Sequence, residues 1–168
     1  MVFRWEFQEQ DIIARGEGVG RIAAPDTGRV DFFLDGGMGA GRAVLVGDDL
    51  RIPPAAEFAR KFFPPAPLLW ATLGRLAVPA GKDTVARVEG DTLRADINVS
   101  RNEVWRIHVV LGRLARVERI SGGRIVEQVV RTSDTRVRYD QLENRRSLTI
   151  DVTKTFTVSG FNSEIWAP

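Results

Sequence analysis

The chain has 168 residues, 43% of them hydrophobic, so it can bury a real core and is not a disordered segment. It contains no cysteine, which excludes disulfides, thiolate metal sites, a cysteine nucleophile and a lipid-anchoring cysteine within these residues. The formal net charge is +2, and arginines alternate with acids along the strand-like segments, which favours a solvated sheet face over a nucleic-acid surface. We expect residues 1–168 to form a single domain.

The first 52 residues are predicted to form an antiparallel meander of strands. Residues 2–8 alternate apolar and polar side chains, and residues 12–24 carry glycine at every second position from Gly16 to Gly20. Such glycines indicate either a strongly coiled strand at a sheet corner or a bare floor left for a ligand or a packed helix. Further short strands are predicted at residues 29–35, 42–47 and 50–52.

The period changes after residue 52, where a helical insert is predicted. Residues 55–63 can form a short helix, and Pro64-Pro65 separates it from a second, more apolar helix. Pro67 suits the first turn of that second helix, and Gly74 and Pro79 stop it. Its apolar surface of leucines and Trp70 is too wide for a helix lying on a wet surface. It must therefore be covered, either by the concave face of a sheet or by something that the protein carries.

The remainder of the chain returns to strand period. Strands are predicted at residues 84–89, 92–99, 103–111, 113–120, 124–132, 135–142 and 147–158, and the tail from Gly160 is expected to dock on the body through Phe161, Ile165 and Trp166. A sheet of ten or eleven hairpin-joined strands must curl strongly. The predicted fold is mainly β (α+β): a strongly curved antiparallel sheet, an incomplete β-barrel, with a helical plug or lid at about residues 55–76.

Few residues could support catalysis or hold a metal. His108 is the only histidine, and alternation places it on the polar face of its strand beside Arg106. One histidine without cysteine gives no usual zinc site, and the sequence has no Gly-x-Ser-x-Gly elbow and no P-loop. We therefore predict a protein that is not an enzyme and that needs no metal or cofactor.

Apolar and aromatic residues instead converge on the helical insert and on the strands before it. They form either an ordinary core or the lining of a lipid pocket closed by a helical lid, because pockets for lipid chains need an apolar lining and few polar groups. The residues predicted to bind a ligand are Phe32, Leu34, Phe58, Phe62, Leu69, Trp70, Leu73 and Trp105.

The order of these segments resembles the LolA/LolB-like group of outer-membrane lipoprotein carriers and receptors. The resemblance lies in the glycine-rich strand and hairpin of residues 14–34, in residues 39–45 and in the helix-to-loop segment 68–79, and it extends over about residues 2–152. Members of that group have a curved, incomplete barrel whose mouth is plugged by helices and whose apolar cavity receives acyl chains. The resemblance implies non-enzymatic binding of lipid or lipoprotein acyl chains, in the periplasm or at the outer-membrane periphery, with lipoprotein trafficking as the process.

Two departures from that group keep an alternative open. The chain lacks the anchoring cysteine of the receptor form, and Phe3-Arg4-Trp5-Glu6-Phe7 stands where an N-terminal helix is usual. We expect any signal or anchor to belong to a precursor rather than to these residues. The alternative is a structural or docking subunit of a membrane-associated complex, with the cavity filled by its own side chains and the tail from Gly160 contacting the partner. No nucleic-acid partner is expected under either interpretation.

Overall fold

Twelve antiparallel strands form one sheet in the computed structural model, which describes residues 1–37 and 40–167 and all of their side chains except those of Ala40 and Phe58. The strands are β1 (Val2–Glu9), β2 (Ile12–Ala23), β3 (Thr27–Leu34), β4 (Ala40–Val46), β5 (Asp49–Arg51), β6 (Asp83–Glu89), β7 (Thr92–Asn98), β8 (Glu103–Val110), β9 (Arg113–Ser121), β10 (Arg124–Arg131), β11 (Arg136–Gln141) and β12 (Arg146–Lys154). Two 3-10 helices, η1 (Pro54–Phe62) and η2 (Ser163–Trp166), and one α-helix, α1 (Ala66–Thr72), complete the chain.

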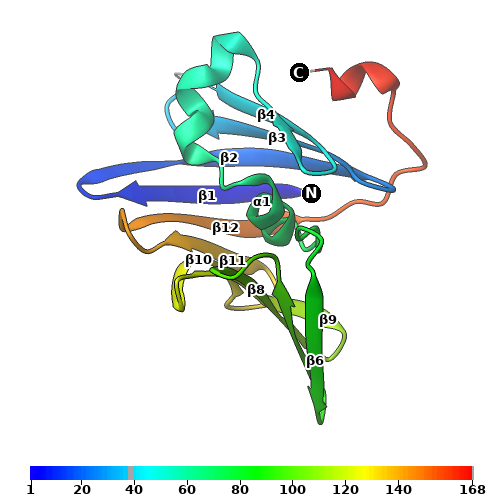
Figure 1. Ribbon diagram of the computed structural model, residues 1–168. Coiled ribbons are helices and arrows are strands. Elements are labelled where there is room, and N and C mark those ends of the chain that lie inside the picture. The colour runs from blue at the N-terminus through cyan, green and yellow to red at the C-terminus, as the bar shows by residue number, and fades with distance from the viewer. Residues whose placement is uncertain (38–39, 168) are drawn as a thin grey trace.

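The sheet is strongly curved and does not close (Figure 1). Its order is β5-β4-β3-β2-β1-β12-β11-β10-β9-β8-β7-β6, so β5 and β6 are its two edges. Helices η1 and α1 lie on the concave side, between the two halves of the sheet. The predicted incomplete barrel with a helical insert is confirmed, with twelve strands rather than ten or eleven.

The middle of the sheet is formed by the first and last strands of the chain. Strand β1 pairs with β2 on one side and with β12 on the other, so that Trp5 lies opposite Gly16 and Ile150. Because directly opposed residues of paired strands point to the same face of the sheet, Trp5, Gly16 and Ile150 form one row across the concave face. The inward residues of β1 (Phe3, Trp5 and Phe7) are almost completely buried there.

Two predicted elements extend several residues beyond the ends that the structure shows, whereas most other boundaries differ by one or two residues. Helix α1 ends at Thr72 rather than near residue 76, because Gly74 adopts φ +80° and the amide of Arg75 donates to the carbonyl of Trp70 at 2.9 Å. Leu76 therefore lies outside the helix and is 51% exposed. Strand β12 ends at Lys154 rather than at residue 158, since Lys154 pairs with Val2, where β1 begins.

Within residues 1–37 and 40–167, no helix combines the length and the apolar character needed to cross a membrane.

Candidate functional site

The concave face is covered by the segment of residues 54–73, which contains η1 and α1. A proline precedes each helix and another occupies its first turn. Proline lacks a backbone N–H, but an N–H in the first turn would have no partner within the helix, so no hydrogen bond is lost. Six of the seven residues of α1 are buried, and Leu68 and Leu69 are fully buried. Burial of each leucine side chain stabilises the fold by about 1.5–3 kcal/mol, so α1 is held mainly by packing.

Glycines of the sheet make room for this covering segment and for the first strand. A Cβ atom at Gly28 would lie 2.7 Å from Cη2 of Trp70, and one at Gly20 would lie 3.5 Å from Cδ2 of Leu73. A Cβ at Gly18 would meet the ring of Phe3 at 2.3 Å. The glycine-rich face is therefore a floor on which the protein's own side chains lie. The indole Nε1 of Trp70 fixes the helix further by donating to the carbonyl of Gly47 at 2.6 Å.

Aromatic rings connect η1 to the sheet. Phe62 contacts Phe7 edge to face with ring centroids 4.8 Å apart, and Phe63 contacts Phe32 in the same way at 5.1 Å. Trp5 in turn packs on Phe32 at 5.2 Å. Such edge-to-face pairs add about 0.5–1.5 kcal/mol each beyond their apolar burial. They make η1 part of the same apolar cluster as the centre of the sheet.

A polar group lies at the η1 end of the concave face. Glu127 is buried and accepts hydrogen bonds from Tyr139 Oη at 2.6 Å and from Arg119 Nε at 2.7 Å. Burial, and then the hydrogen bond to Glu127, raise the pKa of the Tyr139 phenol, so this tyrosine stays protonated and donating. Farther along the same end, Arg146 pairs with Glu9 across β12 and β1.

An opening of about 570 Å³ beside η1 borders this polar group. Its walls come from the helical segment on one side and from β10, β11 and β12 on the other, and they include Glu57, Arg60, Lys61, Phe63, Glu127, Tyr139, Gln141 and Arg146. Phe63 belongs to the buried aromatic cluster, so the opening reaches from solvent to the edge of the apolar core. A molecule with one polar end and one apolar end could therefore contact both kinds of surface here.

No protein-family model and no curated protein matches the sequence, but solved structures match the fold. A LolA superfamily protein from Nitrosomonas europaea is 10% identical with a TM-score of 0.61, and the match covers 99% of this chain and 88% of that one. The fold is LolA-like. A domain from Vibrio parahaemolyticus, named for outer membrane lipoprotein sorting, is 6% identical with a TM-score of 0.53 and covers 98% and 88% of the two chains.

A DUF1329 family protein from Desulfovibrio piger shares the architecture as well. It is 11% identical with a TM-score of 0.53, and the match covers 99% of this chain and 88% of that one. At these identities the likeness concerns the fold. The resemblance to the LolA/LolB-like half-barrels that the order of sequence segments predicted is thus confirmed at the level of the fold.

Most of the residues predicted to bind a ligand lie together in the LolA-like core. Those that are buried in one apolar cluster are Phe32, Leu69, Trp70, Leu73 and Trp105. Leu34 and Phe62 are partly buried against the same cluster, whereas the side chain of Phe58 lies outside the described part of η1. That these eight residues line a ligand pocket remains a prediction. Sequence reasoning missed Glu127 and Tyr139, although both fall on the inward positions of their strands beside Val129 and Val137.

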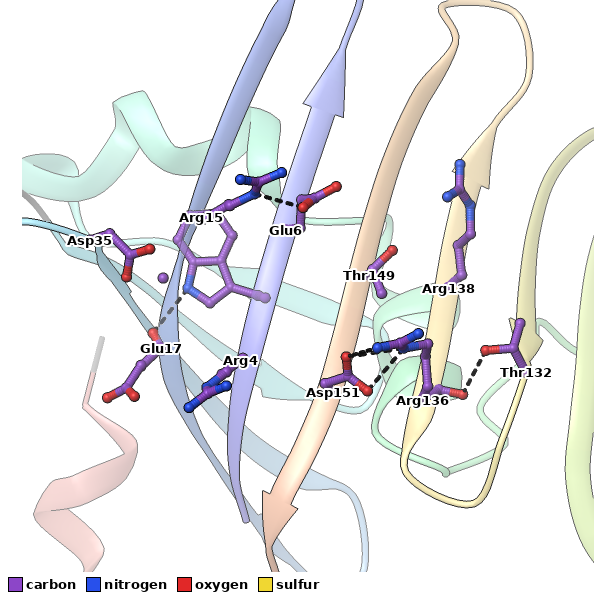
Figure 2. Close-up of a pocket in the computed structure, with 12 residues that line it drawn as sticks. Arg4, Glu6, Arg15, Glu17, Asp35, Thr132, Arg136, Arg138, Thr149 and Asp151 are labelled. Carbon is purple, nitrogen blue, oxygen red and sulfur yellow. Dashed lines mark hydrogen bonds and ion pairs between the residues drawn. The ribbon is translucent and has the colours of Figure 1, made fainter.

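The convex face of the LolA-like sheet is polar. It holds a groove of about 890 Å³ in which Arg15 pairs with Glu6 at 2.7 Å and Arg136 pairs with Asp151 at 2.6 Å (Figure 2). His108 lies on this face, with Nε2 at 3.9 Å from Glu118, and burial lowers its pKa. The prediction of a solvated face in which arginines and acids alternate is confirmed in these pairs.

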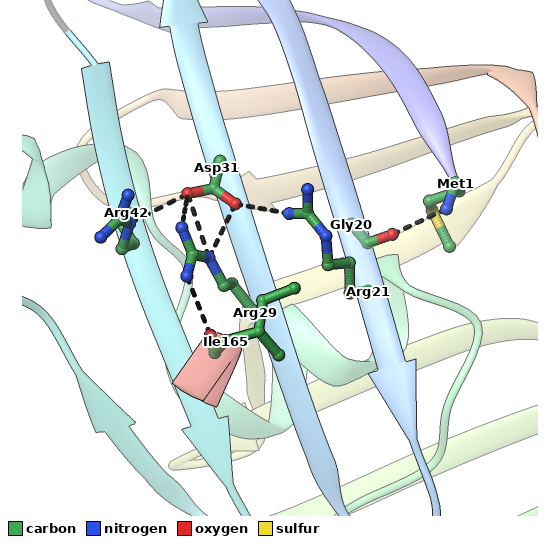
Figure 3. A network of polar contacts seen from close by, with 7 residues as sticks. All are labelled: Met1, Gly20, Arg21, Arg29, Asp31, Arg42 and Ile165. Atoms are coloured by element: carbon green, nitrogen blue, oxygen red, sulfur yellow. Dashed lines mark hydrogen bonds and ion pairs between the residues drawn. The ribbon is translucent and has the colours of Figure 1, made fainter. Parts of the chain in front are cut away.

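A buried carboxylate on the same face holds the C-terminal tail. Asp31 on β3 accepts hydrogen bonds from Arg21, Arg29 and Arg42, and Arg29 also donates to the carbonyl of Ile165 in η2 at 2.8 Å (Figure 3). Burial alone would raise the pKa of Asp31, but the hydrogen bonds from Arg29 and Arg42 outweigh it and lower the pKa. The tail thus docks on the outer surface of β3.

Among residues 1–37 and 40–167, no three histidine, aspartate or glutamate side chains approach closely enough to hold a metal ion.

Proposed function

We propose that this protein binds lipid or lipoprotein acyl chains without catalysis, in the bacterial cell envelope, on the concave face beneath η1 and α1. The main support for the proposal is the way in which the concave face is covered. The apolar interior is closed by one short segment, residues 54–73, with a proline pair at or just before the start of each helix. An opening at the η1 end of this segment joins polar and apolar surface. This construction suits a cover that moves aside, because the sheet would remain paired without it.

An acyl chain would lie between the curved sheet and the displaced cover, in the space that Leu68, Leu69 and Trp70 now fill. Each buried methylene contributes about 0.8 kcal/mol, so a long chain can offset the loss of these contacts. The polar end of the ligand would lie at the opening beside η1, near Arg146 and Tyr139. The ligand-lining role of Phe32, Leu34, Phe58, Phe62, Leu69, Trp70, Leu73 and Trp105 is part of this proposal.

Similarity of fold supports the proposal. One neighbour is a LolA superfamily protein, and another is named for outer membrane lipoprotein sorting. We infer from them a place in the periplasm or at the outer-membrane periphery, and an acylated lipoprotein or a free lipid as the partner.

The first test is native mass spectrometry of the purified protein, with organic extraction of anything bound. A retained lipid or acylated peptide supports the proposal and gives the ligand class. A protein that carries no lipid and takes up no fluorescent fatty acid contradicts it.

The second test locks the cover onto the sheet. A Cβ at Gly41 of β4 would lie 2.8 Å from Cβ of Ala59 in η1, so the pair G41C/A59C can form a disulfide after a small shift. Because the chain has no other cysteine, the bond is unambiguous. Oxidised G41C/A59C should lose fatty-acid uptake and regain it on reduction, whereas A59C alone should bind in both states. Uptake that is unaffected by the disulfide would refute displacement of the cover.

A second function, a docking subunit of a membrane-associated complex, is favoured by one observation. The side chains of Leu68, Leu69 and Trp70 already occupy the concavity and are buried there, and Trp70 packs directly on Gly28 of the sheet. Under this proposal the protein binds no fatty acid in either redox state of G41C/A59C, and deletion of residues 160–168 abolishes membrane association. Under the lipid proposal the same deletion leaves fatty-acid binding intact.

A further inference from the structure

The two edges of the sheet are built differently. Strand β5 has three residues and is followed closely by Pro53 and Pro54, so it offers little backbone for another strand to pair with. Strand β6 has seven residues, contains no proline, and every one of its residues is exposed. In an antiparallel ladder every second residue directs its amide and carbonyl away from its neighbour, so β6 carries a row of such groups at a free edge.

The hairpin of β6 and β7 extends away from both termini and from η1 (Figure 1). Val85 on one face of β6 is 49% exposed, and Val88 on the other face is 72% exposed. Strands exposed on both faces are marginally stable unless a further strand pairs with them. The edge therefore has the length, the backbone groups and the apolar side chains of a strand-pairing surface.

The charges along β6 select its partner. We propose that β6 pairs antiparallel with β6 of a second copy of this chain, with Val85 opposite Val85. In such a dimer the two-fold axis is normal to the sheet. Directly opposed residues must point to the same face, so one residue of the strand always lies opposite its own copy, and the axis passes between these two copies. With the axis at Val85, Asp83 of each copy lies opposite Arg87 of the other, which gives two opposite-charge pairs over five paired residues.

The other symmetric registers are poorer. An axis at Ala86 places Asp83 opposite Glu89 at both ends of the strand, and an axis at Arg87 places Arg87 opposite itself. Like charges directly opposite each other are destabilising. An axis at Val88 opposes Arg87 to Glu89, but only three residues of β6 then overlap, because the chain turns at Gly90. An axis at Thr84 also overlaps only three residues of β6 and forms no opposite-charge pair among them.

Disulfide trapping tests the register directly in this cysteine-free chain. V85C should form a covalent dimer under mild oxidation, because directly opposed residues bring their Cβ atoms close to disulfide distance. V88C is the control, since Val88 is even more exposed than Val85 but lies opposite Lys82 in the proposed register. If V88C links as fast as V85C, the register is wrong.

Charge reversal tests the same pairing without a crosslink. D83R and R87D each place two like-charge pairs across the interface, and each should raise the dissociation constant measured by sedimentation about tenfold or more. The double variant D83R/R87D restores both pairs and should restore the affinity. These side chains are exposed, and circular dichroism of the variants checks that the fold is kept. A monomer at all concentrations, or a double variant as weak as the single ones, overturns the proposal.

Discussion

Replacement of Gly28 by alanine tests whether α1 is seated on the sheet as described. Gly28 lies in β3, and its backbone conformation is open to any residue, so the only change is steric. The new Cβ would lie 2.7 Å from Cη2 and 3.0 Å from Cζ3 of Trp70, against an optimum of about 3.5–4.0 Å. Overpacking of this size costs about 1–3 kcal/mol, because the helix or the strand must shift.

For a chain of this length, about 1 kcal/mol corresponds to roughly 2–4 °C in Tm, so G28A should lower Tm by roughly 2–12 °C. Thermal unfolding followed by circular dichroism measures the shift. Gly160→Ala is the matched control, because no atom lies within 4 Å of its Cβ position, and it should leave Tm nearly unchanged. Equal Tm values for G28A and G160A would refute the described contact.

A double-mutant cycle with Trp70→Phe sharpens the test. Phenylalanine lacks the outer indole atoms that the alanine at position 28 would overlap, so G28A should cost less in the W70F background than in the natural sequence. Equal costs in both backgrounds would show that the steric conflict lies elsewhere. If the cover moves aside for a ligand, G28A should in addition raise the affinity for a fluorescent fatty acid, because it weakens the seating of α1.

Three further changes probe other contacts. Tyr139→Phe removes a buried donor to Glu127 and should cost about 1–3 kcal/mol in urea unfolding, a loss that an unaffected midpoint would contradict. The hydrogen bond from Arg106 lowers the pKa of Asp96 from 3.8 to about 2, so its stabilisation is present above 3.8 and is lost as pH falls towards 2. Asp96→Asn should therefore flatten the fall of Tm over that pH window, and an unchanged profile would contradict the pairing. Arg29→Ala frees the carbonyl in η2 and should speed proteolysis after residue 154 more than Arg42→Ala, which removes a partner of Asp31 but no contact with the tail; equal cleavage rates in the two variants would contradict this anchoring role.

The order and type of the elements could be read from the sequence because alternation is a local signal. The alternation of apolar and polar residues located the strands, and the proline pairs and Gly74 marked the starts and the end of the helical segments. The end of α1 was misjudged because Leu76 continues the apolar pattern beyond the glycine that stops the helix. Gly74 was recognised as a stop signal, but the apolar Leu76 and the later Pro79 placed the predicted end a few residues too far along the chain.

The site was less predictable because it depends on which strands become neighbours. The bare glycine face was compatible with a ligand or a packed helix, and only the tertiary arrangement places Phe3 and Leu73 over it. Glu127 carried a signal, since it alternates with Val129 and so had to face inward. Its partners Arg119 and Tyr139 could not be assigned, because they come from the two strands that flank it in the sheet.

The pairing of β1 with β12 has a consequence for how the chain reaches this structure. The two strands at the centre of the sheet are separated by nearly the whole sequence, so their contacts form only after residues 146–154 have been synthesised. Until then β1 presents an unpaired edge with three large aromatic side chains, a form that is prone to aggregation. Such non-local closure slows folding. The chain would therefore benefit from a holding chaperone during synthesis or transport, whatever its mature role.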